Sequence, residues 1–340
     1  MKITRIETRL YPHDLIPQLF VEITTDENLT GVGEAWWGLS VKPVESVIND
    51  ALAPLIIGED SGRIEYLWQK IFKYGYRYGT EGIFMCGLSG IDLALWDLLG
   101  KRLNVPVADL LGGTVRDSMK AYASLPPLRQ KDLLVNEVHR AVEAGFAGVK
   151  LHEVEVELVK AAREVVSEDF PLMLDVNGHW TPLQAEENGK KLEAYGLTWL
   201  EEPIWPMQDH QAMIRLRQRV NLKLATGENE YSLKAFDGLM QSQAVDFIQP
   251  EITKIGGLSI ARKISALSDL HNVAICPHSF RTGPAAYANV HWALSQMNME
   301  WLEIPWLPEG FGFPSGIPAL DMKGGKISLP KGVGLGTPII

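Results

Sequence analysis

The hydrophobic and polar positions change their period near residue 115. Before it, apolar and polar residues alternate over 3–10 and 20–25, and the turn-rich stretch NLTGVGEAWW follows, a pattern typical of a small antiparallel sheet. Stretches with helical spacing come next: 44–55, 63–72 and 86–103. Residues 1–115 are therefore expected to form an α+β domain.

From residue 116 onward, short apolar runs alternate with amphipathic stretches. The eight runs expected to be strands are 120–124, 148–152, 172–177, 198–203, 223–228, 245–251, 273–278 and 300–304. Seven helical stretches separate them, and in 154–166 the apolar residues hold one face. Apolar strands separated by helices indicate a parallel sheet that is covered on both faces.

Seven of the eight expected strands end in a polar or ionisable residue. In chain order these residues are Lys150, Asp175, Glu201, Glu228, Glu251, His278 and Glu303, and successive numbers differ by 25, 26, 27, 23, 27 and 25. An open doubly wound sheet would bring only the strands beside its switch point to one site. A closed barrel gathers all of its strand ends around one mouth, so the nearly constant spacing favours a TIM-like barrel.

Three consecutive strand ends carry carboxylates, Asp175, Glu201 and Glu228. Two like charges about 4 Å apart repel by roughly 4 kcal/mol at an effective dielectric near 20, so three of them in one space need a cation. Oxygen ligands that leave positions open for water and substrate suit Mg²⁺, with Mn²⁺ as a substitute. A position in a solvated loop or at a helix N-cap would explain any one of these acids equally well. Only the fact that all three end consecutive strands favours a metal site.

Candidate acids and bases surround the expected metal. Lys150 and His152 alternate by two along one strand, so both face the mouth. His278 ends the seventh strand and Glu251 the sixth. Histidines on opposite sides of a substrate can remove a proton from one face and deliver one to the other.

Two further residues lie beside the expected ligands. Asn177 shares a strand face with Asp175 and is expected to orient a ligand or to contact substrate, with a turn-forming role as the alternative. Glu202 directly follows Glu201, so a strand would turn its side chain away, and a supporting or salt-bridging role is expected.

Composition and charge exclude other classes of function. The 340 residues are 46% apolar and 22% charged, as in a soluble globular protein, and the net charge of −10 argues against broad binding to nucleic acid or to an anionic membrane. Cys86 and Cys276 show no metal or redox spacing and are expected to be buried free thiols. Since neither a signal peptide nor an apolar run of about 18 residues is apparent, a cytoplasmic location is expected.

The chain resembles the enolase superfamily, and within it the mandelate racemase subgroup. The resemblance rests on VKLHE, MLDVNG, WLEEP, ATGEN, DFIQPEITKIGG, ICPHS and WLEIP, in that order, and on GLSGIDLALWDLLGK and VADLLGG at the end of the first domain. It covers essentially the whole chain. It implies a (β/α)7β barrel over 116–304, an α+β cap made from 1–115 and a C-terminal segment 305–340, and assembly as a homo-oligomer.

The resemblance also implies the chemistry of the site. Asp175, Glu201 and Glu228 would bind Mg²⁺, which holds a substrate carboxylate while a base removes the proton from its α-carbon. Lys150 would supply further positive charge where negative charge develops, and Glu303 would donate a hydrogen bond if it is protonated.

This sequence departs from the family's pattern at two positions. The commonest second-strand motif is Lys-x-Lys, whose second lysine is a base, and His152 stands there. The family's His-Asp dyad has an aspartate on the sixth strand, where this chain has Glu251. A glutamate can still hydrogen-bond the imidazole of His278, although its reach differs. Lys254 is expected to support the metal ligands rather than to act as a base.

Substrate choice is expected to depend on cap loops at 11–18 and 36–40, with 74–82 near them. Trp36 is the candidate there, with hydrophobic packing as its alternative role, and Arg281 is a candidate for a second carboxylate or a hydroxyl of the substrate.

The leading hypothesis is dehydration of a sugar acid, an aldonate or aldarate, to a 2-keto-3-deoxy acid. The alternatives are a racemase, epimerase or cycloisomerase acting on a carboxylate, and a barrel that binds a metal chelate without turnover. A nucleotide-binding fold is disfavoured, because GVGEA at 31–35 lacks a full G-x-G-x-x-G and falls in a hairpin.

Overall fold

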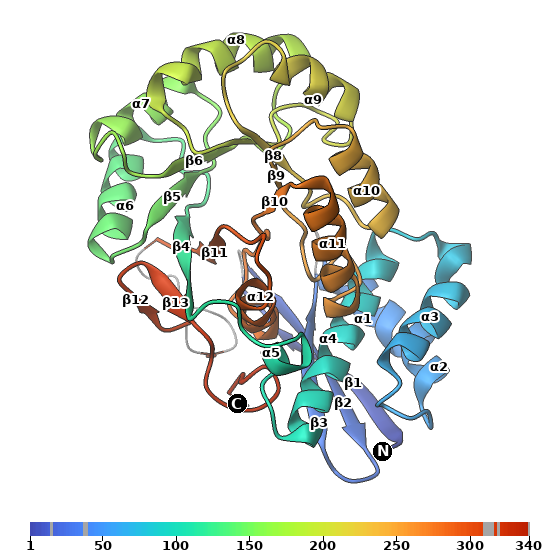
Figure 1. Cartoon of the computed structure of the whole chain (residues 1–340). Coiled ribbons are helices and arrows are strands. Elements are labelled where there is room, and N and C mark those ends of the chain that lie inside the picture. Colours follow the sequence, from blue (N-terminus) through green and yellow to red (C-terminus); the bar gives the residue numbers. More distant parts are fainter. Residues whose placement is uncertain (14–15, 37–39, 309–315, 318–319, 339–340) are drawn as a thin grey trace.

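Parallel strands form a barrel at the centre of the larger part of the molecule (Figure 1). The computed structural model describes the whole chain except residues 14–15, 37–39, 309–315, 318–319 and 339–340. Within the described residues the barrel strands are β4 (Ser118–Ser124), β5 (Gly148–Leu151), β6 (Leu172–Asp175), β7 (Leu200–Glu201), β8 (Leu224–Thr226), β9 (Phe247–Ile248), β10 (Ala274–Ile275) and β11 (Leu302–Pro305).

The barrel strands pair in chain order, and the ring closes. Leu302 of β11 pairs with Ala121 of β4 in parallel, and an isolated parallel bridge joins Ile275 of β10 to Met299, three residues before β11. The intervening helices are α6 (Lys131–Glu143), α7 (Val156–Glu164), α8 (Pro182–Leu192), α9 (His210–Arg217), α10 (Leu233–Gln241), α11 (Leu258–His271) and α12 (Pro284–Leu294), with a 3₁₀ turn at Glu193–Tyr195. The predicted (β/α)7β barrel is confirmed.

Large side chains fill the barrel beneath the strand ends. The inward-facing cluster consists of Tyr122, Met173, Trp199, Ala225, Phe247, Cys276 and Trp301. Tyr122 and Trp199 are fully buried, and their rings meet edge to face with centroids 5.5 Å apart. The barrel is therefore a packed core, so its chemistry is confined to the mouth.

The N-terminal part is a three-stranded antiparallel sheet packed on helices. Its strands are β1 (Ile3–Tyr11), β2 (Gln18–Thr25) and β3 (Thr30–Ala35). Its helices are α1 (Val41–Ser46), a π-helical turn (Val47–Leu52), α2 (Ala53–Ile56), α3 (Ile64–Gly75), a 3₁₀ turn (Tyr76–Tyr78), α4 (Ile83–Leu103) and α5 (Val107–Leu110). The sheet lies at the lower end of the molecule in Figure 1, below the barrel.

The motif GVGEA lies in β3, against α4. A Cβ on Gly33 would come within 2.2 Å of the Gly90 carbonyl oxygen, and one on Gly31 within 2.2 Å of the Ala94 carbonyl oxygen. Both glycines thus allow the strand and the helix to touch through their backbones. This contact gives the motif a packing role.

Helix α4 is long and apolar enough to cross a membrane, contrary to the expectation that no such run exists. However, 89% of its most apolar window is buried inside the protein. The helix packs on β2 and β3 and forms part of the main hydrophobic core. Cys86, on α4, and Cys276, in the barrel interior, are buried free thiols, as expected.

The C-terminal segment contacts both the barrel and the N-terminal part. It contains β12 (Met322–Lys323) and β13 (Lys326–Ser328), and β13 pairs antiparallel with β4. Further along, the Gly334 N–H donates to the Val105 carbonyl at 2.9 Å, and the Val107 N–H donates to the Gly334 carbonyl at 2.8 Å. The domain bounds 1–115, 116–304 and 305–340 stay predictions.

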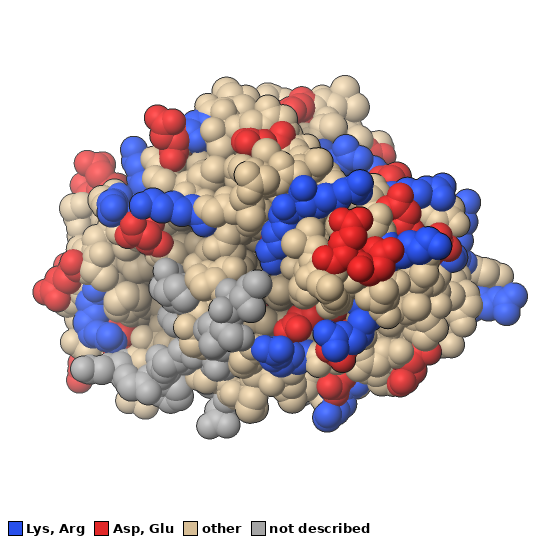
Figure 2. All heavy atoms as spheres, turned by 90° about the horizontal axis from the view of Figure 1, so that it is seen from below, with Lys and Arg blue, Asp and Glu red and all other residues tan. Residues whose placement is uncertain are grey.

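Figure 2 shows one face of the molecule, on which acidic and basic side chains are interspersed. Among the described residues of that face, the basic side chains lie next to acidic ones. The expectation that nucleic acids and membranes are not partners stays a prediction.

His291 of α12 links three parts of the chain. Its Nδ1 accepts a hydrogen bond from the Ala108 N–H at 3.0 Å, and its Nε2 donates to the Leu335 carbonyl at 3.0 Å. The ring is fully buried, and burial lowers its pKa from 6.5 to about 4. His291 is therefore neutral at physiological pH.

We expect this histidine to make the protein less stable in mild acid. The unfolded chain protonates near pH 6.5, before the folded protein does, so the stability contribution is complete above that pH and is lost as pH falls toward 4. Between pH 7.5 and 5.0 the loss is about 2 kcal/mol. Urea unfolding of the wild type and of His291→Gln at both pH values measures it. The same loss in both proteins would contradict the assignment to His291.

Candidate active site

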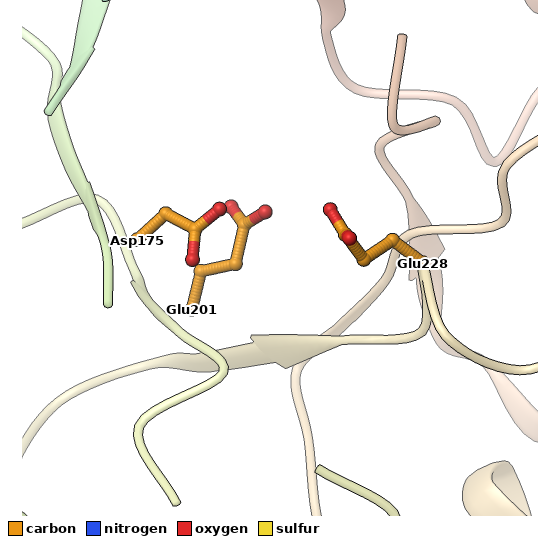
Figure 3. Close-up of side chains that lie close together, drawn as sticks. All are labelled: Asp175, Glu201 and Glu228. Atoms are coloured by element: carbon orange, nitrogen blue, oxygen red, sulfur yellow. The ribbon is translucent and has the colours of Figure 1, made fainter. Parts of the chain in front are cut away.

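The three predicted metal ligands meet at the barrel mouth. Asp175 ends β6, Glu201 ends β7, and Glu228 follows β8 by two residues. One oxygen from each lies within 4.8 Å of the others, and Figure 3 shows the three carboxylates pointing into a common space. Asp175 and Glu201 are buried, and Glu228 is half-buried.

Lys150 lies among these carboxylates, fully buried. Its Nζ is 2.8 Å from Glu201 Oε1, 2.9 Å from Glu303 Oε1 and 3.6 Å from Asp175 Oδ2. Burial opposes the charged form of the ammonium, but the carboxylates outweigh it and raise the pKa of Lys150 well above its ordinary value. Lys150 is thus a fixed positive charge at the mouth.

The donor set fits a hard divalent cation. Burial, followed by the charge of Asp175, raises the pKa of Glu201 to about 8. Burial likewise would raise the pKa of Glu228, but His278 and Lys254 hold it well below its ordinary value. The three carboxylates lie close together and offer only oxygen atoms as ligands. Such a set favours a hard divalent ion such as Mg²⁺, whose charge would relieve the repulsion between the carboxylates.

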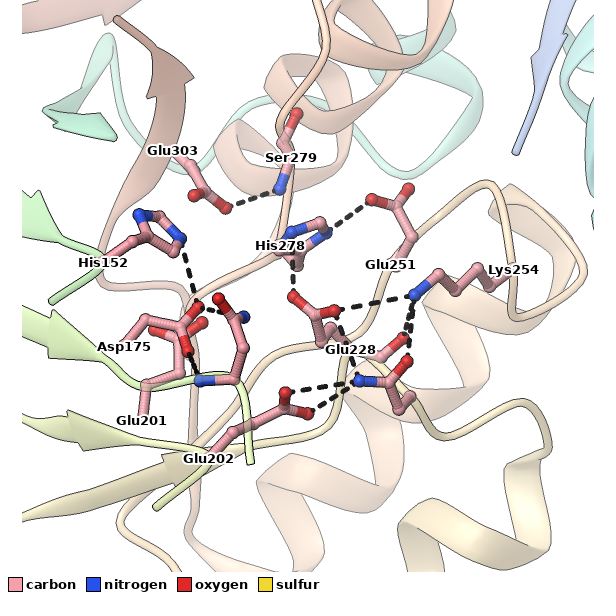
Figure 4. A network of polar contacts seen from close by, with 12 residues as sticks. His152, Asp175, Glu201, Glu202, Glu228, Glu251, Lys254, His278, Ser279 and Glu303 are labelled. Atoms are coloured by element: carbon pink, nitrogen blue, oxygen red, sulfur yellow. Dashed lines mark hydrogen bonds and ion pairs between the residues drawn. The ribbon is translucent and has the colours of Figure 1, made fainter. Parts of the chain in front are cut away.

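His278 connects the ligands to Glu251. Its Nδ1 lies 2.7 Å from Glu251 Oε2 and its Nε2 lies 2.9 Å from Glu228 Oε2, as the dashed lines in Figure 4 show. Burial would lower the pKa of His278, but the charges of Glu228 and Glu303 raise it well above its ordinary value. The ring is therefore a cation with an N–H directed at each carboxylate.

His152 approaches from the strand next to Asp175. Its Nε2 lies 3.3 Å from Asp175 Oδ2, and its Nδ1 hydrogen-bonds the Leu125 carbonyl. Since a carbonyl can only accept, Nδ1 carries a proton, and in the neutral ring Nε2 is the nitrogen with the lone pair. That nitrogen faces the site (Figure 4).

Glu303 accepts hydrogen bonds rather than donating one. Its Oε2 accepts from the Ser279 N–H at 2.7 Å, and its Oε1 pairs with Lys150. Burial would raise the pKa of Glu303, but Lys150 and then His278 outweigh it and lower the pKa below the ordinary value. Glu303 is thus ionised here. The hydrogen bond that it was expected to donate to substrate would require the protonated carboxyl group.

Asn177 holds the ligand Asp175. Its backbone N–H donates to Asp175 Oδ1 at 2.8 Å and its Nδ2 donates to Oδ2 at 3.1 Å. Asn177 has φ of 44°, in the left-handed region that asparagine tolerates better than most residues. Asn177 also lies in a turn, so these contacts suit both the ligand-orienting and the turn-forming role, and its role toward metal and substrate stays a prediction.

Trp36 lies between two cations near His278. The Lys254 Nζ and the Arg281 Cζ are each 4.0 Å from its ring centroid, and its ring lies 5.9 Å from that of His278. Arg281 is 2% exposed, and among its charged neighbours are Glu251 and Glu34. The substrate contacts expected for Trp36 and Arg281 stay predictions. Parts of the two expected cap loops, residues 14–15 and 37–39, lie outside the described residues.

Several supporting residues were missed by the sequence analysis. Trp199 Nε1 donates to Glu201 Oε2 at 2.8 Å, and Asn229 Nδ2 donates to Glu202 Oε1 at 3.0 Å. Trp199 shares a strand face with Glu201, so alternation by two could have found it. Asn229 also accepts from Lys254 Nζ at 3.3 Å, and that Nζ donates to the Glu228 carbonyl at 3.0 Å. Glu202 and Lys254 thus lie beside the ligand Glu228, and their supporting roles stay predictions.

The comparisons with known proteins agree with this arrangement. The family described as mandelate racemase / muconate lactonizing enzyme, N-terminal domain, matches residues 14–112, and that described as enolase C-terminal domain-like matches 133–339. The arabinonate dehydratase of Saccharolobus solfataricus is 32% identical over 329 residues, which are 94% of this chain and 87% of that protein.

Two solved structures are similar over nearly their whole length. The 3,6-anhydro-D-galactonate cycloisomerase from Zobellia galactanivorans has a TM-score of 0.91 at 30% identity and covers 100% of this chain and 97% of its own. A racemase from Streptomyces coelicolor A3(2) with bound magnesium has a TM-score of 0.89 at 26% identity, with 99% and 97% covered. The chain therefore belongs to the enolase superfamily, among its mandelate racemase and muconate lactonizing enzyme relatives.

Proposed function

We propose that this protein is a Mg²⁺-dependent dehydratase that converts a sugar acid, an aldonate or aldarate, to a 2-keto-3-deoxy acid. The observation that carries the proposal is the set of three carboxylates within 4.8 Å, with His152 and His278 approaching it from different strands. The 32% sequence identity between this chain and an arabinonate dehydratase supports a sugar acid as the substrate. Asp175, Glu201 and Glu228 would hold Mg²⁺, with Mn²⁺ as a substitute.

Bound Mg²⁺ would stabilise the negative charge that a substrate carboxylate gains when its α-proton leaves. The charge on Lys150 acts in the same direction, because its ammonium is buried and fixed by Glu303 and Glu201. His152 takes the α-proton on Nε2, since Leu125 holds a proton on Nδ1. The broken C–H bond leaves its electron pair on the substrate.

His278 then supplies the second proton. It protonates the β-hydroxyl, the C–O bond breaks, and the hydroxyl leaves as water. The enol that remains takes up a proton on its third carbon and releases its hydroxyl proton, which gives the 2-keto-3-deoxy acid, so the reaction adds up to loss of one water molecule. Glu251 holds the His278 ring, and Asn177, Trp36 and Arg281 are proposed to contact the rest of the substrate.

The second candidate is a racemase, epimerase or cycloisomerase. The structural likeness to a sugar-acid cycloisomerase supports it. It shares the first step and differs in where the proton returns or which group leaves. We further propose that residues 1–115 and 305–340 cap the barrel, and that the protein works in the cytoplasm as a homo-oligomer.

Proton NMR in D₂O tests the reaction directly. The protein is incubated with Mg²⁺ and a pooled set of aldonates, aldarates and simple hydroxy acids. We expect one sugar acid to disappear while a 3-deoxy methylene signal grows. An α-proton signal that fades while the compound or its epimer persists would favour the isomerase, and ligand binding without any exchange would favour a chelate-binding protein.

A further inference from the structure

We propose that Thr253 is a positioning residue that fixes the carboxylate of Glu251 and, through it, the ring of His278. The inference deepens the proposed function and rests on it, because it concerns the residue that delivers the second proton. Thr253 lies two residues after Glu251, in the turn that follows β9.

The two oxygens of Glu251 have separate partners. Oε1 accepts from the Thr253 N–H at 2.9 Å and from the Thr253 Oγ1 hydroxyl at 2.6 Å. Oε2 faces His278 Nδ1 at 2.7 Å. Glu251 and Thr253 are fully buried and His278 is 6% exposed, so competing water does not reach these contacts easily. The carboxylate is therefore held from one side by Thr253 and presents its other oxygen to the imidazole.

A glutamate needs this support more than an aspartate does. The backbones of Glu251 and His278 form a parallel bridge, so the two side chains start from adjacent positions. Glutamate has one more rotatable bond than aspartate, and its terminal torsion is broad. Two donors on Oε1 fix that torsion and direct the lone pairs of Oε2 toward Nδ1. Because Nδ1 is engaged, Nε2 is the nitrogen that faces the ligand carboxylates (Figure 4).

The hydroxyl can be removed without disturbing the turn. Backbone N–H groups of Lys254 and Ile255 donate to the Glu251 carbonyl at 2.8 and 3.1 Å, independently of the Thr253 side chain. The Thr253 N–H also remains in the valine and serine variants. Thr253→Val therefore replaces only the hydroxyl, at nearly the same volume, and Thr253→Ser keeps the hydroxyl while losing the methyl group.

We expect Thr253→Val to lower kcat for dehydration by about 10- to 100-fold, the usual effect of losing a hydrogen bond to a buried charge. KM should change by less than about two-fold, since the Thr253 hydroxyl is fully buried against Glu251. Thr253→Ser should restore kcat to near the wild-type value. When Glu251 is already replaced by glutamine, Thr253→Val should lower kcat by a smaller factor, because the carboxylate that Thr253 orients is absent.

A measurement on the protein without substrate or metal gives an independent readout. The Nδ1 proton of His278, directed at a carboxylate, should give a low-field proton resonance that disappears in His278→Asn. It should persist in Thr253→Ser and broaden or shift upfield in Thr253→Val. Thermal unfolding of all variants checks that they are folded.

The outcomes separate the inference from the function on which it rests. If the wild type dehydrates a sugar acid and Thr253→Val matches it, the role of Thr253 is wrong and the function stands. Equal losses in the valine and serine variants would assign the effect to side-chain volume and also overturn the role. If the wild type turns over no sugar acid, the proposed function fails, and the low-field resonance alone decides whether Thr253 positions the ring.

Discussion

Replacing His278 by asparagine is expected to lower kcat for dehydration by about 10²- to 10⁴-fold. Asparagine keeps a polar side chain but cannot deliver a proton to a leaving hydroxyl. Both nitrogens of His278 face carboxylates, Glu251 at 2.7 Å and Glu228 at 2.9 Å, so the ring is held as a charged donor. Because Glu228 keeps its own oxygens, Mg²⁺ binding should persist.

Steady-state turnover and calorimetric Mg²⁺ titration measure the two effects separately. His139→Asn is the matched control, because His139 is an exposed histidine on the outer helix α6. Turnover in His278→Asn equal to that of the control would exclude His278 as the acid. Loss of turnover together with loss of Mg²⁺ binding would show that the substitution damaged the metal site instead.

Removal of divalent metal is expected to abolish turnover and to destabilise the fold. Without a cation the carboxylates of Asp175, Glu201 and Glu228 repel one another across distances within 4.8 Å. Any ion that binds the folded protein alone stabilises it, by about 2.7 kcal/mol when its concentration is 100 times Kd. Chelation by EDTA should remove this stabilisation, and added Mg²⁺ should restore both stability and turnover.

Asp175→Asn tests whether the ion sits at the predicted ligands. Its unfolding free energy should respond little to a Mg²⁺ concentration that stabilises the wild type. Asp169→Asn, at an exposed loop position, should respond as the wild type does. Full turnover by protein shown to be metal-free by elemental analysis would contradict the whole scheme, and Mn²⁺ in place of Mg²⁺ tests the proposed substitute.

The strand ends could be predicted because one physical rule governs them. In a parallel barrel the last inward-facing residue of every strand lies at the same mouth. The spacing of 23 to 27 residues between Lys150, Asp175, Glu201 and the later strand-end residues therefore predicts that their side chains meet there. The closed barrel and the gathering of these residues at one mouth follow from that rule, whereas the pairing of His278 with Glu251 was expected only from the resemblance to the family.

Other parts of the site depend on turns that sequence patterns do not describe. Thr253 and Asn229 lie beyond the strands, and their partners depend on where the chain bends after β9 and β8. Glu202 has φ of 42°, a left-handed conformation that ends the strand and points its carboxylate at Asn229. The strand β9 is likewise only Phe247–Ile248, shorter than the apolar run 245–251, because the chain leaves the ladder to enter the mouth.

The backbone hydrogen bonds between Gly334 and Val105 and Val107 bear on how the protein is made. The ribosome produces Gly334 about 230 residues after its partners, so the N-terminal part emerges while this contact is still missing. Val32 and Leu335 both donate to Asp97, on α4, at 2.8 Å, but only the first is available early in synthesis. The N-terminal part therefore gains these backbone contacts, and the fully buried Leu335 side chain beside α4, only after the barrel has been synthesised.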